Sequence, residues 1–485
     1  MEFPFDPAGF AAATGRILPG NASRDLSGLP TPASVWRRGW QSCRRRCMGE
    51  WRWQRVQRKK QLGDGLALIR QEIGIPGKPI LAYVVPYDIV KLQTGGGKRI
   101  AGIARALGAE FRVFILSLSP GSRPFSVKGI APGVWMVAIP ASEEFEESAR
   151  EQTVAGGGAA PLFAFADHFE QLPEFHAVLG ALSRDVRTWA LSSPMAWPPV
   201  QRFFMPDRQR LIYDVHDDLP RFLGVVLGCT DGPLLERAEA MEGEVLKQAS
   251  HAAFCTAEDA AATRLRHPEA REKIVMVPNG VDVEACHAAF PAQAGQNRQM
   301  AGVDRPVVLF AGAHHKPNYE AVDWIAREWA PMFPRALFVV MGMHLAPYRE
   351  SGGAEPGANM VFTGPVSEEI KEAVFSLAEV ALAPMKSGTG SSLKIPDYIA
   401  HGKIVVGTSL GLRGFEAGKG FPSIIVSENI GDDLERVLTR LAEAPDAFTD
   451  SCRRAREWVA STLDWAVAAR PLVEALKVQI DGVVR

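Results

Sequence analysis

The chain has 485 residues, 47% of them hydrophobic and 22% charged, and its formal net charge is −1. This composition is typical of a globular protein with two or three domains, and the near-zero charge argues against a nucleic-acid partner. Its 6 cysteines form no Cys-x-x-Cys pair, and no His/Cys group has zinc-ligand spacing. We find no apolar run of membrane-spanning length and no secretory signal, so we expect a reduced, cytoplasmic protein without a metal.

The first 75 residues differ from the rest. Residues 1–35 are rich in Pro, Gly, Ala and Ser, which predicts a flexible segment. Residues 36–60 interleave tryptophans with many Arg and Lys residues, and Glu50 is their only acid. Such a segment suits an anionic membrane surface, with rings at the headgroup level and cations on phosphate; the alternative is a solvated tail without a partner. We therefore predict a flexible basic extension over residues 1–75, with peripheral contact at the inner face of the cytoplasmic membrane as one hypothesis.

Apolar runs that alternate with helical stretches begin at about residue 79. The predicted strands are residues 79–85, 111–118, 133–139, 187–193, 210–215, 251–256 and 273–277. Helical spacing is found at 99–107 and 233–249. Strand, helix and strand at this spacing indicate right-handed βαβ units in a parallel sheet. We assign residues 76–290 to a first Rossmann-like domain.

A second group of strands follows a polar stretch around residues 292–305. The predicted strands are residues 306–310, 336–341, 360–364, 380–383, 404–406 and 423–426. Helical stretches lie between them at 319–333, 367–377 and 433–444. The fold class is therefore α/β, with a second doubly wound Rossmann-like domain over residues 291–460. Residues 461–485 are predicted to be helical, with a kink at Pro471.

A glycine-rich turn precedes a short helical stretch near residue 394. The N–H groups of such a turn, with the positive end of the helix, can converge on a diphosphate. The residues concerned are Gly388, Thr389, Gly390, Ser391, Ser392 and Leu393. Lys394 is interpreted as a phosphate-binding cation or a surface lysine. Asp397, about two helical turns into the segment, either accepts hydrogen bonds from a ribose or merely favours the early turns of its helix.

Two segments of the predicted first domain also contain candidate residues for binding a diphosphate or a sugar. Three glycines, Gly95, Gly96 and Gly97, either let the backbone approach a diphosphate or acceptor, or form a plain βα turn. His216 follows the predicted strand 210–215, where ligands bind in such sheets, and is either a sugar contact or an ordinary loop histidine. Asp217 and Asp218 either orient an acceptor hydroxyl or cap a helix.

Five segments, in this order, resemble retaining glycosyltransferases of family 4. They are Gly95–Gly97 with Arg99, Tyr213–Asp218, Val277–Asp282, Phe310–Asn318, and Lys386–Asp397 with its continuation to Ser409. The last resembles the branch that reads Gly-Thr/Ser-Gly-x-x-x-Lys-Ile-x-Glu. The resemblance implies the GT-B fold, in which two Rossmann-like domains face each other across a cleft and a C-terminal helix crosses back to the first domain.

The resemblance also implies an activity: transfer of a sugar from a nucleotide-diphosphate donor, a UDP- or GDP-sugar, to a hydroxyl acceptor with retention of configuration. The branch points to exopolysaccharide or other cell-surface glycan assembly, with a glycan or lipid-linked acceptor and no further cofactor. His216 and Asp217 would then be the catalytic residues. No carboxylate is placed as a covalent nucleophile, which fits a front-face mechanism.

Several positions depart from the family pattern. Ala313 stands where many members have Arg, and Lys316 is a substitute in a different register. Ser192 and Ser193 stand where others have an active-site histidine, and Thr389 replaces the first glutamate of the better-known motif. Two alternatives therefore stay open: a GT-B protein that binds nucleotide without catalysis, and a dinucleotide-dependent oxidoreductase. Against the latter, no Gly-x-Gly-x-x-Gly follows the first strand.

Overall fold

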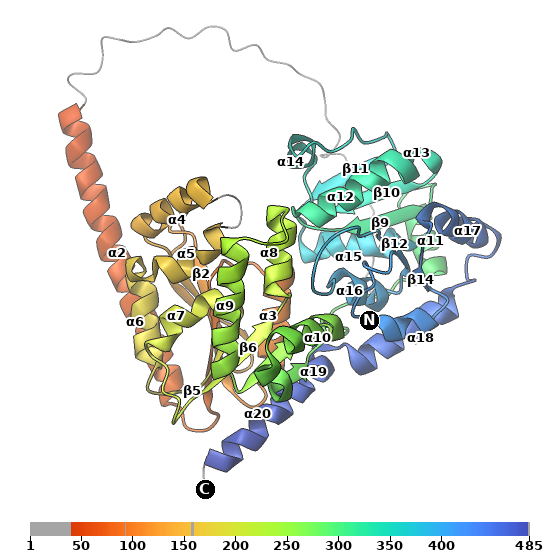
Figure 1. The fold of residues 1–485 in the computed structure, drawn as a ribbon. Helices are drawn as coiled ribbons and strands as arrows, with labels where there is room; N and C mark the ends of the chain where they lie inside the picture. Colours follow the sequence, from red (N-terminus) through yellow and green to blue (C-terminus); the bar gives the residue numbers. More distant parts are fainter. Residues whose placement is uncertain (1–39, 93, 157–159, 484–485) are drawn as a thin grey trace.

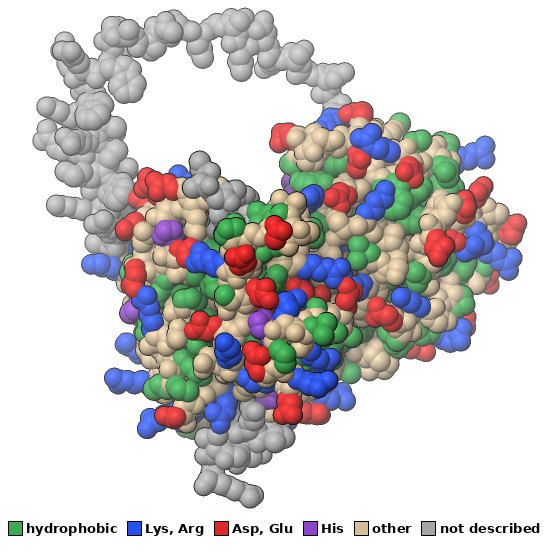
Figure 2. All heavy atoms as spheres, in the orientation of Figure 1, with side chains coloured by type: hydrophobic (Ala, Val, Ile, Leu, Met, Phe, Trp, Pro, Cys, Tyr) green, Lys and Arg blue, Asp and Glu red, His purple; other side chains and the backbone are tan. Residues whose placement is uncertain are grey.

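The computed structural model describes residues 40–92, 94–156 and 160–483. They form two α/β domains, each built around its own sheet (Figure 1). Among these residues, no helix combines the length and apolar character of a membrane span. Figure 2 shows basic and acidic side chains interspersed over the visible face, in keeping with the near-zero net charge.

The first sheet has eight strands in the order β3-β4-β2-β1-β5-β6-β7-β8. Their bounds are β1 Ile80–Val85, β2 Arg112–Ser119, β3 Ser126–Ala131, β4 Val134–Pro140, β5 Val186–Leu191, β6 Arg210–Val215, β7 His251–Phe254 and β8 Ile274–Met276. All neighbours are parallel except β3 and β4, which form an antiparallel edge pair. The sequence did not predict β3, because Ser, Lys and Gly interrupt its apolar residues and the strand is largely exposed at the sheet edge.

Helices cover both faces of this sheet. They are α3 Gly95–Leu107, α4 Glu143–Gly156, α5 Ala164–Asp167, α6 Pro173–Leu182, α7 Trp197–Gln201, α8 Leu219–Leu227, α9 Pro233–Gln248 and α10 Ala257–Arg266. Alternate residues of β1 enter different cores, with Ala82 on one face and Tyr83 on the other. A strand buried on both faces reads as a continuous apolar run, which is why β1 was predictable.

The helix α2, Trp40–Gly74, corrects the prediction of a flexible extension through residue 75. Four apolar residues at helical spacing pack against the first core: Leu62, Leu66, Ile69 and Ile73. Arg112 also donates to the carbonyls of Glu72, at 2.6 Å, and Pro76, at 2.9 Å. The C-terminal half of α2 therefore belongs to the first domain. The predicted flexibility of residues 1–35 lies outside the described residues, as do the side chains of residues 36–56.

The second sheet has six parallel strands in the order β11-β10-β9-β12-β13-β14. Their bounds are β9 Val307–Ala311, β10 Leu337–Met341, β11 Met360–Gly364, β12 Val380–Ala383, β13 Ile404–Gly407 and β14 Ile424–Val426. The helices are α11 Pro291–Met300, α12 Lys316–Trp324, α13 Ala330–Met332, α14 Leu345–Glu350, α15 Glu368–Leu377, α16 Lys394–Ala400, α17 Ile430–Glu443 and α18 Thr449–Thr462. One core lies on each face of the sheet.

The chain returns to the first domain at its C-terminal end (Figure 1). The helices α19, Trp465–Ala468, and α20, Arg470–Val483, pack against α3 and β8. The returning segment runs beside the outgoing one, because the Val281 N–H donates to the Leu463 carbonyl at 2.9 Å. The break between α19 and α20 falls just before Pro471, as the proline predicted. The predicted crossing of the last helix is thus confirmed.

Candidate functional site

The loop of residues 388–393 contacts the first domain directly. Gly388 has φ +126° and Gly390 has φ +63°, both in the left-handed region that favours glycine. A Cβ on Gly390 would lie 2.6 Å from Oδ1 of Asp217 and 2.7 Å from the carbonyl oxygen of His216. Thr389 Oγ1 donates to Asp217 Oδ1 at 2.8 Å. The structure therefore brings two of the predicted motifs together, although they lie far apart in the sequence.

Arg413 holds the 388–393 loop from one side. Its Nε donates to the Gly390 carbonyl at 2.7 Å and its Nη2 to the Gly388 carbonyl at 3.4 Å. In a trans peptide the N–H points opposite to the C=O, so the N–H of Thr389 is turned away from this guanidinium. Within the described part of the chain, the N–H groups of Thr389, Ser392 and Leu393 make no backbone hydrogen bond. Unpaired N–H groups close together in a glycine-containing loop are suited to form an anion site. No sequence signal pointed to Arg413.

Lys394 begins α16 beside these N–H groups. Its Nζ donates to Asn318 Oδ1 at 3.0 Å and lies 4.2 Å from the centroid of the Phe310 ring. Burial lowers the pKa of Lys394 to about 7, and no carboxylate counters this effect among the described residues. A half-buried lysine that directly follows this loop, with no acidic partner among the described residues, is suited to bind an anion.

Lys316 lies beside the same loop. It begins α12, and a Cβ on Gly388 would lie 3.7 Å from the ring of Pro317, the next residue. The side chain of Lys316 is exposed, as is Ala313. Its position therefore agrees with a second cation at the edge of the anion site, whereas its register differs from the family pattern.

Gly95, Gly96 and Gly97 form the first turn of α3, not a turn that precedes a helix starting at residue 99. Thr94 caps this helix by accepting the Gly97 N–H at 3.1 Å, and this threonine is the signal that would have placed the start. A Cβ on Gly96 would lie 3.3 Å from His216 Nδ1, and one on Gly95 would lie 3.2 Å from Leu393. The glycines therefore meet both the histidine and the 388–393 loop.

His216 is held by a buried carboxylate. Its Nε2 lies 2.9 Å from Asp214 Oδ2, and Asp214 Oδ1 accepts from Arg99 Nη2 at 2.7 Å. Burial opposes ionisation, but the ion pair with Arg99 and the hydrogen bonds from His216 and Tyr83 hold the pKa of Asp214 well below its usual range. The ionised carboxylate therefore accepts a hydrogen bond from the Nε2–H of His216, and the Nδ1 atom of His216 faces Gly96.

Asp217 and Asp218 have different roles. Asp217 accepts from the opposite domain, as described above. Asp218 caps α8, since it accepts from the Arg221 N–H at 3.3 Å, and it also binds Arg266 at 2.9 Å. The capping interpretation therefore holds for Asp218, and Asp217 is the residue that faces the 388–393 loop.

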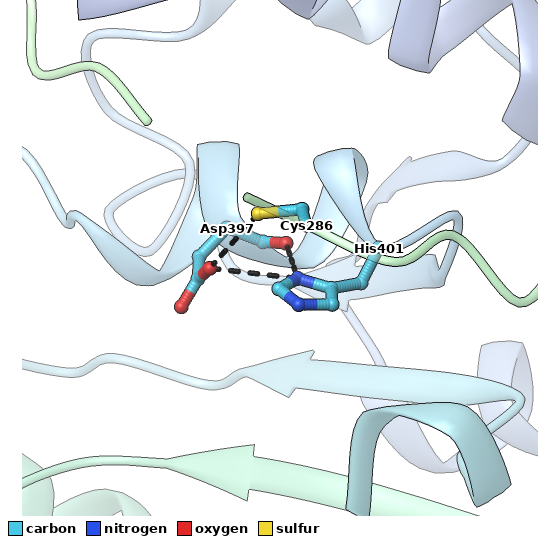
Figure 3. Close-up of side chains that lie close together, drawn as sticks. All are labelled: Cys286, Asp397 and His401. Carbon is cyan, nitrogen blue, oxygen red and sulfur yellow. Dashed lines mark hydrogen bonds and ion pairs between the residues drawn. The ribbon is translucent and has the colours of Figure 1, made fainter. Parts of the chain in front are cut away.

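Asp397 falls in the first turn of α16, not two turns into the segment. Its Oδ1 accepts from Lys371 Nζ at 3.1 Å and lies 3.9 Å from Cys286 Sγ (Figure 3). His401 places Nδ1 at 2.6 Å from the Asp397 carbonyl and Nε2 at 2.8 Å from Glu372.

Cys286, Asp397 and His401 lie close enough to share a metal ion, a grouping that the sequence spacing did not reveal. However, the Lys371 ammonium already neutralises Asp397, and both nitrogens of His401 face acceptors. Burial also raises the pKa of the Cys286 thiol, so that it stays protonated. The chemistry of this group fits a hydrogen-bonded cluster that supports α16 better than a cation site.

Ser192 and Tyr87 occupy the remaining edge of the site. Ser192 is buried, and its hydroxyl donates to the Val84 carbonyl at 3.3 Å. The Tyr87 hydroxyl would lie 3.1 Å from a Cβ on Gly96, so this side chain stands next to His216. Tyr87 was not predicted; its place two residues beyond β1 was the available signal.

The sequence model of the family described as Glycosyl transferases group 1 matches residues 305–444, most of the second domain. The 2-deoxystreptamine glucosyltransferase of Streptomyces kanamyceticus is 28% identical over 231 residues, which are 46% of this chain and 58% of that protein. The match therefore spans little more than half of that relative.

Several solved structures share the whole architecture. Sucrose-phosphate synthase from Thermosynechococcus elongatus has a TM-score of 0.62 at 16% identity, over 84% of this chain and 100% of its own. The catalytic domain of starch synthase IV from Arabidopsis thaliana, bound to ADP and acarbose, has a TM-score of 0.58 at 13% identity with the same coverage. The fold is GT-B. Anabaena HepE in complex with UDP and glucose is a further GT-B neighbour, with a TM-score of 0.56 at 13% identity, over 82% of this chain and 100% of its own.

Proposed function

We propose that this GT-B protein is a glycosyltransferase that moves a sugar from a nucleotide-diphosphate donor to a hydroxyl acceptor, with retention of configuration. One observation carries the proposal: the 388–393 loop, which leads into Lys394, lies against His216 and Asp217 of the other domain. A site for a dianion thus adjoins polar groups suited to a sugar. The similarity of residues 305–444 to group 1 glycosyltransferases supports the same activity.

The second domain would stabilise the leaving group. Negative charge grows on the diphosphate as the sugar–phosphate bond breaks, and preorganised donors aimed at that charge lower the barrier. We assign this role to the N–H groups of Thr389, Ser392 and Leu393 and to Lys394, with Lys316 at the edge. The Asp397 carboxylate would accept a hydrogen bond from a ribose hydroxyl, while its Oδ1 also accepts a hydrogen bond from Lys371.

The first domain would orient the sugar and the acceptor. His216 offers Nδ1 as a hydrogen-bond partner for a sugar hydroxyl, since Asp214 fixes Nε2. Asp217 is engaged by Thr389, so we assign it to holding the loop and the acceptor side together and not to covalent attack. The departing diphosphate oxygen would then take the proton of the acceptor hydroxyl.

We further propose a UDP- or GDP-sugar donor and a place in cell-surface glycan assembly. A lipid-linked acceptor at the inner membrane face would be reached by way of the basic tryptophan-rich residues 36–60, most of which belong to the first half of α2. The C-terminal half of α2 is packed on the first domain, which contains His216, so membrane contact would bring the acceptor side close to the lipid surface.

The test is binding followed by transfer. Thermal unfolding is recorded with UDP, GDP, ADP, TDP and NAD without added metal; a ligand of the folded state raises the melting temperature. The matching nucleotide sugars are then assayed for release of the nucleoside diphosphate. We expect one nucleoside diphosphate to stabilise the protein, and K394M to lose this effect while K386M, at an exposed lysine stacked on Trp324, keeps it. A response to NAD alone would instead identify a redox enzyme, and tight nucleotide binding without release would identify a non-catalytic protein.

A further inference from the structure

An unbroken series of hydrogen bonds connects His216 with the 388–393 loop. It runs from His216 through Asp214 and Arg99 to Asn279, which reaches Ser391 in the other domain. Arg99 and Asp214 are each 1% exposed and Asn279 is 4% exposed. Arg99 Nη1 lies 3.0 Å from Asn279 Oδ1, and Asn279 Nδ2 lies 3.0 Å from the Ser391 carbonyl and 2.9 Å from its Oγ.

The orientation of the Asn279 amide is dictated by its neighbours. A guanidinium only donates hydrogen bonds, so Arg99 requires the amide oxygen on its side. The amide NH₂ must therefore face Ser391, where two oxygens accept from it. A carboxylate at this position would satisfy Arg99 but would set oxygen against oxygen at the loop.

The backbone around Asn279 is fixed at the junction of the domains. A Cβ on Gly280 would lie 2.5 Å from the Leu463 carbonyl, and Val281 is hydrogen-bonded to that same carbonyl. The returning C-terminal segment thus leaves the side chain little freedom to move. A side chain held at one end by a buried cation and bonded at the other end to a glycine-containing loop is suited to set the position of that loop.

We propose that Asn279 is a positioning residue that sets the 388–393 loop against the first domain and joins the loop to the Arg99–Asp214–His216 series. The proposal rests on the proposed function, in which this loop binds the diphosphate of the donor. Loss of the Asn279 amide lets the loop shift, so that its N–H groups no longer converge on the ligand, while the fold and the orientation of His216 remain.

The test compares N279D with wild type. The variant keeps an oxygen for Arg99, but its second oxygen faces the Ser391 carbonyl, so that hydrogen bond is lost and the Ser391 hydroxyl must turn to donate. We expect the Kd of the stabilising nucleoside diphosphate, measured by calorimetry, to rise about 10–100-fold, since the loop loses a hydrogen bond and meets oxygen–oxygen repulsion in its place. The donor KM should rise by a similar factor, while kcat at saturating donor and its pH profile stay within about twofold. The melting temperature without ligand should fall only slightly, by the amount expected for a single lost hydrogen bond.

Two further variants keep the interpretation secure. N279A, which removes both ends of the series, replaces N279D if the added charge prevents folding, and it should show the same loss of affinity. N297D is the matched control, because Asn297 Nδ2 likewise donates to a serine carbonyl, that of Ser376 at 3.1 Å, away from the loop. We expect N297D to bind nucleotide like wild type.

If wild type binds no nucleoside diphosphate, the proposed function fails. If wild type and folded N279D or N279A bind with equal Kd, the role of Asn279 is refuted.

Discussion

Nucleotide binding should draw a proton from solution at Lys394. Partial burial of the free Lys394 side chain, with no acidic partner among the described residues, lowers its pKa to about 7. A diphosphate beside it favours the charged form, and an opposite charge at this distance raises the pKa of a lysine by about 1–3 units. The bound form therefore titrates at about 8–10, and with about 9 as the middle of this range the protonation state changes on binding at mildly alkaline pH.

The magnitude follows from the two pKa values. At pH 8 the free amine is about one-tenth protonated and the bound amine about nine-tenths, so binding takes up about 0.8 proton. At pH 6 both forms are largely protonated, and the uptake is about 0.1 proton. Because the complex holds more protons, affinity falls as pH rises from about 7 to about 9, by up to tenfold per unit.

Isothermal calorimetry measures this uptake. The observed binding enthalpy is compared in HEPES and in Tris at pH 8, because the two buffers differ in ionisation enthalpy and the slope gives the number of protons. K394M should bind more weakly with a slope near zero. K403M is the matched control: burial also lowers the pKa of Lys403 to about 7, but its Nζ donates to the carbonyls of Ala289 and Ala378, not to the loop. It should keep the wild-type slope. Saturable binding with no slope in wild type, or an unchanged slope in K394M, would refute the reasoning.

Three further outcomes are expected. G390A should weaken nucleotide binding at least tenfold, because its Cβ would lie only 2.6 Å from Asp217 of the first domain. G302A is the control for backbone strain alone, since Gly302 has a similar φ of +74° and no atom within 4 Å of an added Cβ. Equal losses of binding in the two variants would exclude a steric cause. D214N should lower the free energy of unfolding by about 3–5 kcal/mol in denaturant titrations, since Arg99 stays buried without its anion; a loss below about 1 kcal/mol would contradict this. The unfolding free energy should rise with pH between about 7 and 10.5 through Lys394 and Lys403, because the unfolded chain binds the extra protons there. K403M should show a smaller slope than wild type, and an identical slope would disprove the buried amine of Lys403.

Most of the sheet was predictable because its strands are buried on both faces and read as apolar runs. The exceptions have physical reasons. The strand β3 is exposed at the edge and carries polar residues, so it has no such run. The helix α2 was not predicted because the basic, tryptophan-rich composition of its first half indicated an extension. The helical spacing of Leu62, Leu66, Ile69 and Ile73 in its second half does indicate a packed helix.

The site was predictable as segments but not as an assembly. Glycines 388 and 390 were identifiable from their residue type, since the backbone there needs left-handed conformations. The hydrogen bond from Thr389 to Asp217 depends on the tertiary structure, because the two residues are far apart in sequence and no periodicity relates them. Arg413 acts through carbonyl groups, which every residue carries, so its contacts leave no pattern in the sequence. Asn279 lies in the recognised segment Val277–Asp282, but its partners Arg99 and Ser391 are distant in sequence.

The return of the chain at Leu463 makes the first domain discontinuous. Its core includes Trp465, Ala469, Leu472 and Leu476 together with residues of β1 and α3. During synthesis, the first domain must therefore wait with part of that core uncovered until the whole second domain has left the ribosome. For the same reason, cutting the chain between the domains would not yield an independent first domain, and the two halves are expected to recover a native core only when they are produced together.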